Sequence, residues 1–199
     1  MSKLKEFLIN RLLRQRLACR FRWMIRHEQN LRLPLPYPPA QIPLICREVD
    51  EIDLPGFLEF IDPQILPELR QRLKEGHLCI AAYHQGRAVG FTWLNPNLVY
   101  EASTGMQFPL KPGELFSYHK LVHPDYRNQG VSPQLDWERD RLLTAKGFHN
   151  RISIIDRNNL AALRTAEKAG TIPVRHLIFI QVLGLPFVVS WPMKKTKSK

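Results

Sequence analysis

The chain has 199 residues, 44% of them apolar and 24% charged, which suits a soluble globular domain with its own core rather than a disordered segment. Its three cysteines stand apart without a CxxC pair and its seven histidines occur singly, so neither a disulfide framework nor a metal site is expected, and a reducing cytoplasm is the expected compartment. The net charge of +11 is concentrated at the ends, because residues 1–32 carry nine Lys or Arg against two Glu and residues 194–199 carry four Lys and no acid.

Residues 3–28 are expected to form a basic amphipathic helix, because large apolar side chains recur there every three or four positions with arginines between them. No apolar run is long enough for a membrane span, and the arginines argue against a secretory signal. Three interpretations stay open: a helix on an anionic membrane surface, a helix docked on the protein's own domain or a partner subunit, and contact with nucleic acid. Five prolines in residues 33–43 predict an extended linker. The expected organisation is therefore an extension over 1–32, the linker, a domain over 44–192 and a basic tail over 193–199.

Within the domain, strands and helices alternate after an initial hairpin. Alternating apolar residues, turn residues and helix stops predict these elements in chain order: a strand at 44–49, one or two helices over 54–75, a hairpin of 77–83 and 87–94, a loop over 95–113, a strand at 114–122, a helix at 131–147, a strand at 151–155, a helix at 159–169, and closing strands at 172–180 and 186–191. This order is typical of an α/β fold in which a mixed sheet carries helices on both faces.

Residues 122–132, Val-His-Pro-Asp-Tyr-Arg-Asn-Gln-Gly-Val-Ser, join a strand to a helix through a polar turn. The N-terminus of a helix carries unsatisfied N–H donors and a partial positive charge, so it is a natural seat for a phosphate. Arg127 adds a planar cation, and Gly130 allows a ligand to approach the backbone closely. The alternative is an ordinary connection between a strand and a helix.

A second signal lies in residues 156–170, where cap-type residues precede an Ala/Leu-rich helix that ends at a glycine. The cap-type residues are Asp156, Asn158 and Asn159. Together the two segments resemble the GNAT superfamily of acyl-CoA N-acyltransferases, whose patterns are Val-x-Pro-x-Tyr-Arg-x-x-Gly-x-Gly/Ala and Asn-x-x-Ala-x-x-x-Tyr-x-x-x-Gly. The resemblance covers residues 44–192 and implies a twisted mixed sheet of about six to seven strands whose fourth and fifth strands splay apart. Two positions depart from the patterns: Ser132 replaces Gly or Ala, and Ala166 replaces the tyrosine that protonates the departing thiolate.

The resemblance also implies which residues bind acetyl-CoA, or another acyl-CoA. It assigns the diphosphate to Arg127 and to the N–H groups of Asn128, Gln129, Gly130, Val131 and Ser132, and the pantetheine amides to the backbone at Leu121 and Val122. Asn159 aligns with the family's helix asparagine, which steadies the cofactor. A plain helix cap is the alternative for Asn159, and the two roles are compatible.

Transfer of an acyl group to an amine needs a neutral amine, a donor for the carbonyl oxygen and a protonated leaving group. Tyr118 and His119, on the strand that enters the site, are the candidate catalytic residues, His119 because it titrates near neutrality. Because side chains alternate along a strand, both can face the substrate only if a bulge separates them. A backbone N–H at such a bulge is the candidate donor to the carbonyl oxygen.

The favoured function is an N-acyltransferase that moves an acyl group, most often acetyl, from acyl-CoA to a primary amine of a small molecule or amino sugar by direct attack in a ternary complex. The alternatives are a non-catalytic CoA-binding module and a basic protein associated with nucleic acid or the ribosome. The expected partners are the amine, an anionic inner-membrane surface contacted by residues 1–32 and, as an option, a second copy of the chain. No specific nucleic acid and no metal are expected. The acceptor, the acyl length, the oligomeric state and the effect of Ala166 on catalysis stay open.

Overall fold

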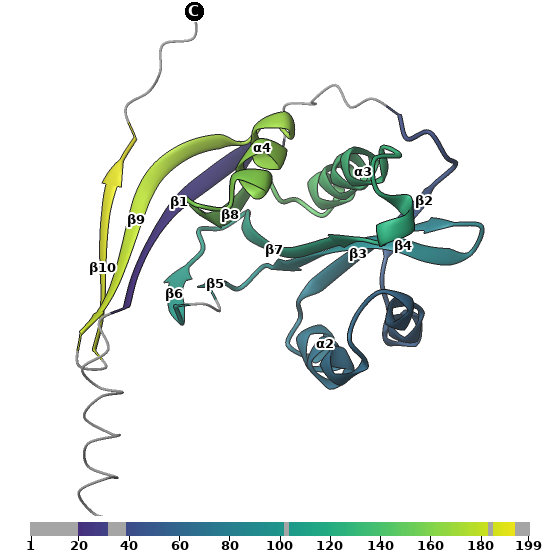
Figure 1. Cartoon of the computed structure of the whole chain (residues 1–199), viewed down its shortest axis with the longest axis horizontal. Helices are drawn as coiled ribbons and strands as arrows, with labels where there is room; N and C mark the ends of the chain where they lie inside the picture. Colours follow the sequence, from purple (N-terminus) through teal and green to yellow (C-terminus); the bar gives the residue numbers. More distant parts are fainter. Residues whose placement is uncertain (1–19, 32–38, 102–103, 183–184, 194–199) are drawn as a thin grey trace, which may run out of the picture.

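A computed structural model of the chain describes residues 20–31, 39–101, 104–182 and 185–193, and its largest element is an eight-stranded mixed sheet (Figure 1). The strands follow the order β10-β9-β1-β8-β7-β4-β3-β2 across the sheet. Their bounds are β1 Arg20–Asn30, β2 Ile45–Glu48, β3 Leu78–His84, β4 Arg87–Asn95, β7 Glu114–Val122, β8 Asn150–Asp156, β9 Ile172–Val182 and β10 Leu185–Pro192. A small second sheet pairs β5 Leu98–Glu101 with β6 Met106–Pro109.

Helices cover both faces of the sheet, as expected (Figure 1). One face carries α3 and α4, and the other carries α2, the 3₁₀ segment η1 and the β5–β6 hairpin. The helical bounds are η1 Glu51–Glu59, η2 Pro63–Ile65, α2 Leu66–Lys74, η3 Pro124–Tyr126, α3 Val131–Ala145 and α4 Leu160–Lys168. None of the helices in the described ranges is long and apolar enough to cross a membrane.

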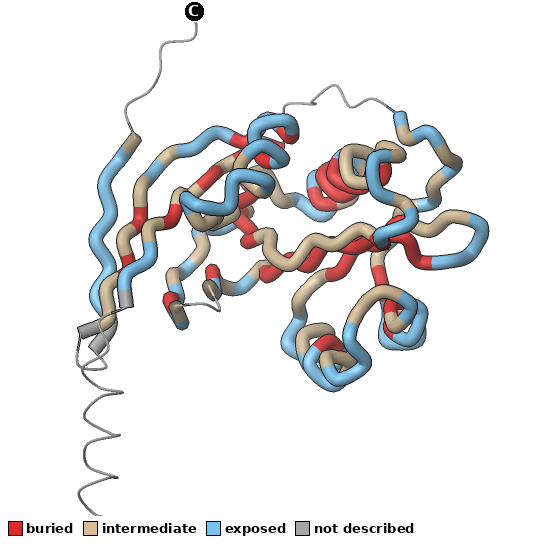
Figure 2. The backbone as a smooth tube through the Cα atoms, viewed as in Figure 1, coloured by how far each residue is buried: buried red, intermediate tan, exposed pale blue. Residues whose placement is uncertain are grey.

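Two apolar cores sandwich the middle of the sheet. Val131, Leu135 and Leu143 of α3 pack on one face against alternate residues of β3 and β4. Phe57 of η1 and Leu69 of α2 pack on the other face. Figure 2 shows the buried positions gathered where β3, β4 and β7 pass beneath α3, whereas β10 is exposed over residues 187–192. The two cores thus support the middle of the sheet on both faces, next to β7, the strand that leads into the predicted phosphate loop.

The helix predicted over residues 3–28 is wrong for residues 20–28. These residues belong to β1, which pairs antiparallel with β8 on one side and β9 on the other. Burial falls on Met24, His27 and Gln29, so two of the three inward side chains are polar and a bulge at Arg26/His27 breaks the alternation. The pattern could not be recognised as a strand for these reasons. The expected membrane contact of residues 1–32 thereby loses part of its basis, and residues 1–19 lie outside the described residues.

Two further expectations need correction. The main sheet has eight strands rather than six or seven, because β1 enters it from the predicted extension. Residues 95–113, predicted to be a loop, contain β5 and β6, whose Val99 and Phe108 pack against Phe116 of β7. Residues 33–38 of the predicted linker and residues 194–199 of the predicted tail lie outside the described ranges. Residues 39–43 of the linker are described, and residues 39–41 contact the phosphate loop, as set out below.

Candidate active site

The candidate site begins where β7 and β8 separate. These two parallel strands pair only from Glu114↔Asn150 to Phe116↔Ile152. Beyond Phe116, β7 stays paired with β4 on its other side, and β8 stays paired with β1. The backbone of residues 117–122 therefore faces an opening on one side, where its polar groups can receive a strand-like ligand.

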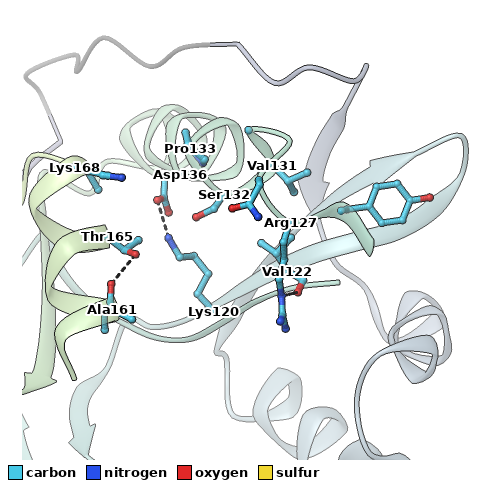
Figure 3. A pocket seen from close by; sticks show the side chains of 15 residues that line it. Lys120, Val122, Arg127, Val131, Ser132, Pro133, Asp136, Ala161, Thr165 and Lys168 are labelled. Atoms are coloured by element: carbon cyan, nitrogen blue, oxygen red, sulfur yellow. Dashed lines mark hydrogen bonds and ion pairs between the residues drawn. The ribbon is translucent and has the colours of Figure 1, made fainter. Parts of the chain in front are cut away.

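A cleft of about 1000 Å³ occupies this opening and runs to the start of α3 (Figure 3). Its walls come from β7, the loop after β7, α3 and α4. It is lined by Lys120, Val122, Tyr126, Arg127, Asn128, Gly130, Val131, Ser132, Pro133, Asp136, Ala161, Ala162, Thr165, Lys168 and Ala169. A deeper lobe of about 440 Å³ continues between β7, β8 and α4, and it shares Lys120, Asp136, Ala162, Thr165 and Ala169 with the outer cleft.

The loop that was predicted to bind the diphosphate lines the outer end of the cleft. Among the described residues, no acceptor takes a hydrogen bond from the N–H groups of residues 128–132, and no side chain caps α3. Arg127 is exposed beside them, its Nε donating to the Val122 carbonyl at 3.4 Å. Free donors, a helix N-terminus and a guanidinium thus fit a diphosphate.

Gly130 also has a packing role that the sequence did not indicate. It adopts the left-handed conformation with φ 81°, and a Cβ there would lie 2.8 Å from the Cα of Ala40. Residues 39–41, here called the strap, lie on the loop: the Gln41 N–H donates to the Gln129 carbonyl at 2.9 Å, and the Ala40 N–H donates to Gln134 Oε1 at 3.3 Å. The absent side chain makes room for the strap, which holds the loop from outside.

On the α4 side, Asn159 and Ala166 both line the deeper lobe. The Asn159 side chain accepts a hydrogen bond from the Ala162 N–H at 3.1 Å, so it caps α4 while it faces the lobe. Ala166 is buried and offers only a methyl group, so α4 brings no acid to the position where the family pattern has tyrosine.

A β-bulge at His119 interrupts the pairing of β7 with β4. The register of β4 against β7 shifts from Thr92↔Lys120 to Trp93↔Tyr118, which leaves His119 unpaired, and His119 has a φ of 44°. The bulge turns both side chains toward the face that carries α2, where Tyr118 contacts His77 and His119 contacts Arg72. The bulge that would allow Tyr118 and His119 to face the same side of the strand is therefore present.

Hydrogen bonds decide what these side chains can do. Arg72 can only donate, so its contact with His119 Nδ1 at 2.9 Å makes that nitrogen the acceptor and places the ring proton on Nε2. The Tyr118 hydroxyl lies 2.5 Å from His77 Nδ1. Burial, aided by the Arg72 cation, lowers the pKa of His119, and burial lowers the pKa of His77 although Glu75 opposes it. Burial raises the pKa of Tyr118, so near neutral pH both rings are uncharged and the phenol keeps its proton.

Lys120 and Asp136 were missed by the sequence reasoning. Lys120 leaves β7 on the face opposite Tyr118 and His119, and its Nζ lies 2.8 Å from Asp136 Oδ2 (Figure 3). The second oxygen of Asp136 accepts from Arg139 at 2.5 Å, and Arg139 also contacts Asp140 at 2.7 Å. Arg151 of β8 lies 3.5 Å from Asp140. The two residues of the pair are sixteen positions apart on a strand and a helix, and no local pattern signals such a pair.

Comparison with known proteins agrees with this geometry. The model of the Acetyltransferase (GNAT) family matches residues 46–171, more than half of the chain. The chain therefore belongs to the GNAT acetyltransferase family, which uses acyl-CoA as co-substrate. A comparison with curated proteins finds no match.

Solved structures share the fold at low identity. A Drosophila protein has a TM-score of 0.57 at 11% identity, with 92% of this chain and 57% of that chain covered. A conserved protein of unknown function from Staphylococcus epidermidis has a TM-score of 0.55 at 11% identity, with 90% and 68% covered. A tandem GNAT protein from the clavulanic acid biosynthesis pathway has a TM-score of 0.51 at 12% identity, with 90% and 55% covered. This chain thus spans little more than half the length of the first and third of these structures.

Proposed function

We propose that the protein transfers an acyl group, most often acetyl, from acyl-CoA to a primary amine of a small molecule or amino sugar by direct attack within a ternary complex. The observation that carries the proposal is the cleft between the splayed ends of β7 and β8, which opens onto the N–H groups of residues 128–132, for which the described ranges hold no acceptor. A diphosphate would lie on those donors near Arg127. The pantetheine amides would lie along the backbone at Leu121 and Val122, in the manner of an added strand.

In this proposal the cofactor and the amine lie on opposite faces of β7, on either side of the bulge. Tyr118 and His119 lie on the face of α2, where we place the amine. A hydrogen bond from the Tyr118 hydroxyl to neutral His77 provides a path by which the amine proton reaches an imidazole. His119, its proton held on Nε2 by Arg72, acts as a hydrogen-bond donor rather than as the general base. A backbone N–H at the bulge remains our candidate donor to the carbonyl oxygen.

The first test is cofactor binding, measured by calorimetry with CoA. Ser132→Glu places a carboxylate at the first turn of α3, where the helix tolerates a negative charge but a bound diphosphate does not. Repulsion of about 1–3 kcal/mol is expected at such a partly exposed site, a loss of roughly fivefold to 150-fold in affinity. Ser132→Gln is the matched neutral control and should bind nearly as the wild type does. Equal affinity of the two variants would contradict the assignment of the loop.

The second test is free-thiol release from acetyl-CoA across a panel of amines, amino sugars and polyamines. Amine-dependent release identifies the enzyme and its acceptor class. Because Ala166 removes the usual acid of α4, a second candidate function is a CoA-binding module without catalysis. Tight CoA binding with no amine-dependent release across the panel would favour that second function.

A further inference from the structure

The side chain of Lys120 is the feature of the cleft that the proposed function leaves unexplained. Lys120 and Asp136 are the two ionisable residues that line both the outer cleft and the deeper lobe. The Lys120 side chain is 26% exposed and that of Asp136 only 3%, so Lys120 borders the cleft with the carboxylate behind it. Figure 3 shows Lys120 rising from β7 toward Asp136, with Thr165 and Lys168 of α4 across the cleft.

The ammonium of Lys120 belongs to a cluster of charged side chains behind the cleft. Three cations meet two carboxylates in the cluster behind the cleft, namely Lys120, Arg139 and Arg151 with Asp136 and Asp140. Arg139 and Arg151 are buried at 1% and 6% exposure, whereas Lys120 borders the cleft. Since Asp136 contacts Arg139 as well as Lys120, its negative charge is shared between two cations. Lys168 from α4 and Arg127 from the loop are the other cations that line the cleft, at its outer part.

The position of Lys120 along β7 matches the end of an extended pantetheine arm. Under the proposed function that arm runs from the loop at 128–132 back along β7, past Val122, toward the bulge at His119. Lys120 adjoins the bulge on the cofactor side of the strand. The facing wall of α4 offers Ala162, Thr165, Ala166 and Ala169, none of which carries an acid. Tyr118 and His119 also line the lobe, but their side chains are bound to His77 and Arg72 on the other face of β7. Among the described residues of the deeper lobe, the ammonium of Lys120 is therefore our candidate proton donor on the cofactor side.

We propose that Lys120 lies beside the departing thiolate of CoA and donates a proton to its sulfur, and that Asp136 positions the Lys120 side chain. This inference rests on the proposed function. The amine nitrogen attacks the thioester carbon, so a C–N bond forms, the C–S bond breaks, and the electron pair leaves on sulfur. One Nζ proton passes to the sulfur, which gives the CoA thiol and a neutral lysine amine. The proton that the attacking amine loses leaves on the opposite face of β7, and solvent reprotonates Lys120.

The burial of Lys120 supports this role. Burial lowers the pKa of Lys120 although Asp136 opposes the change, and Arg139 and Arg151 act in the same direction as burial. A less basic ammonium gives up its proton more readily to a thiolate, whose own pKa is near that of a cysteine.

The test measures the pKa of the thiol of bound CoA from the ultraviolet absorbance of the thiolate as the pH is raised. In the wild type this pKa should lie about one to three pH units below that of free CoA, the effect of an opposite charge within hydrogen-bonding reach. Lys120→Met should abolish the lowering, whereas Lys120→Arg should keep most of it because the charge remains. Lys168→Met, which removes a cation that lines only the outer cleft, should weaken CoA binding and leave the thiol pKa lowered.

The outcomes distinguish failure of the role of Lys120 from failure of the proposed function. Failure of the wild type to bind CoA overturns the proposed function and this inference together. If the wild type binds CoA and the thiol pKa is unchanged, the role of Lys120 alone is overturned. This outcome is measured on the wild type, so it does not depend on whether a variant folds. A lowered thiol pKa that survives Lys120→Met also overturns it, because another group would then be responsible. We expect the thiol pKa to stay lowered in Lys120→Arg and Lys168→Met and to return to that of free CoA only in Lys120→Met.

Discussion

Replacement of Gly130 by alanine should reveal how firmly the strap is seated on the phosphate loop. Gly130 has a φ of 81°, and the new Cβ would lie 2.8 Å from the Cα of Ala40. Gly86, in the turn between β3 and β4, has the same φ of 81°, yet a Cβ there would meet nothing within 4 Å. Gly130→Ala and Gly86→Ala therefore share the backbone strain and differ in the contact with the strap.

The expected magnitudes follow from these two contributions. An L-residue in the left-handed region costs about 1–2 kcal/mol, which is the whole expected effect of Gly86→Ala. At Gly130 the neighbour is backbone and cannot rotate away, so the strap must shift. Its hydrogen bonds to Gln129 and Gln134 are then at risk, each contributing about 0.5–1.5 kcal/mol. Gly130→Ala should therefore lower the free energy of unfolding by about 2–5 kcal/mol.

Urea denaturation of the two variants beside the wild type measures the difference, and calorimetry with CoA shows whether the loop is displaced. We expect Gly130→Ala to lose both stability and CoA affinity, and Gly86→Ala to lose only stability. Adding Ala40→Gly to the Gly130 variant should restore little, because the closest atom is the Cα of residue 40 rather than its Cβ. Equal destabilisation by the two glycine substitutions would refute the reasoning, since the strap would then contribute nothing.

Three further outcomes follow from the buried charges. Arg139→Met should lower the unfolding free energy by about 3–5 kcal/mol because it strips a buried cation from its carboxylate partners, whereas Arg141→Met, which breaks an exposed pair, should cost under about 1 kcal/mol; urea denaturation compares them. Burial opposes ionisation of Asp136, but Arg139 and its other cationic neighbours outweigh it and lower the pKa. Its stabilising contribution is thus present above about pH 4 and lost as the pH falls further, so acid unfolding of the wild type should be steeper than that of Asp136→Asn. Arg72→Met should raise the pKa of His119 part of the way toward its ordinary value, because burial remains, and an NMR titration that shows no change would contradict the contact.

The elements that could be predicted from the sequence are those with local chemistry. The phosphate loop has a proline, an arginine and a glycine within a few residues, and α4 has its cap at Asn159. These signals are set by backbone requirements of neighbouring residues, so they persist whatever the rest of the chain does. The hairpin at Gln85-Gly86 belongs to the same class, since both residues have positive φ.

The features that escaped prediction depend on contacts between distant segments. β1 is a strand because β8 and β9 hydrogen-bond to it on both sides, although its own spacing of apolar residues favours a helix. The bulge at His119 arises from the register against β4, which no alternation within β7 announces. The Lys120–Asp136 pair and the strap on Gly130 likewise join segments brought together only by the folded sheet.

The placement of β1 changes how the basic N-terminal segment should be studied. Removal of residues 1–32 would also take away a strand that pairs with both β8 and β9, and with it Gln29, whose side chain donates to Asp140 at 3.0 Å and accepts from Arg151. That deletion should abolish cooperative unfolding, because it leaves the edges of two strands and a buried charge cluster without partners. Removal of residues 1–19 leaves β1 whole and should preserve the urea transition. Sedimentation with membranes, compared between this shorter deletion and the full chain, then tests whether residues 1–19 bind a membrane. A deletion to residue 32 would report only on the loss of the sheet.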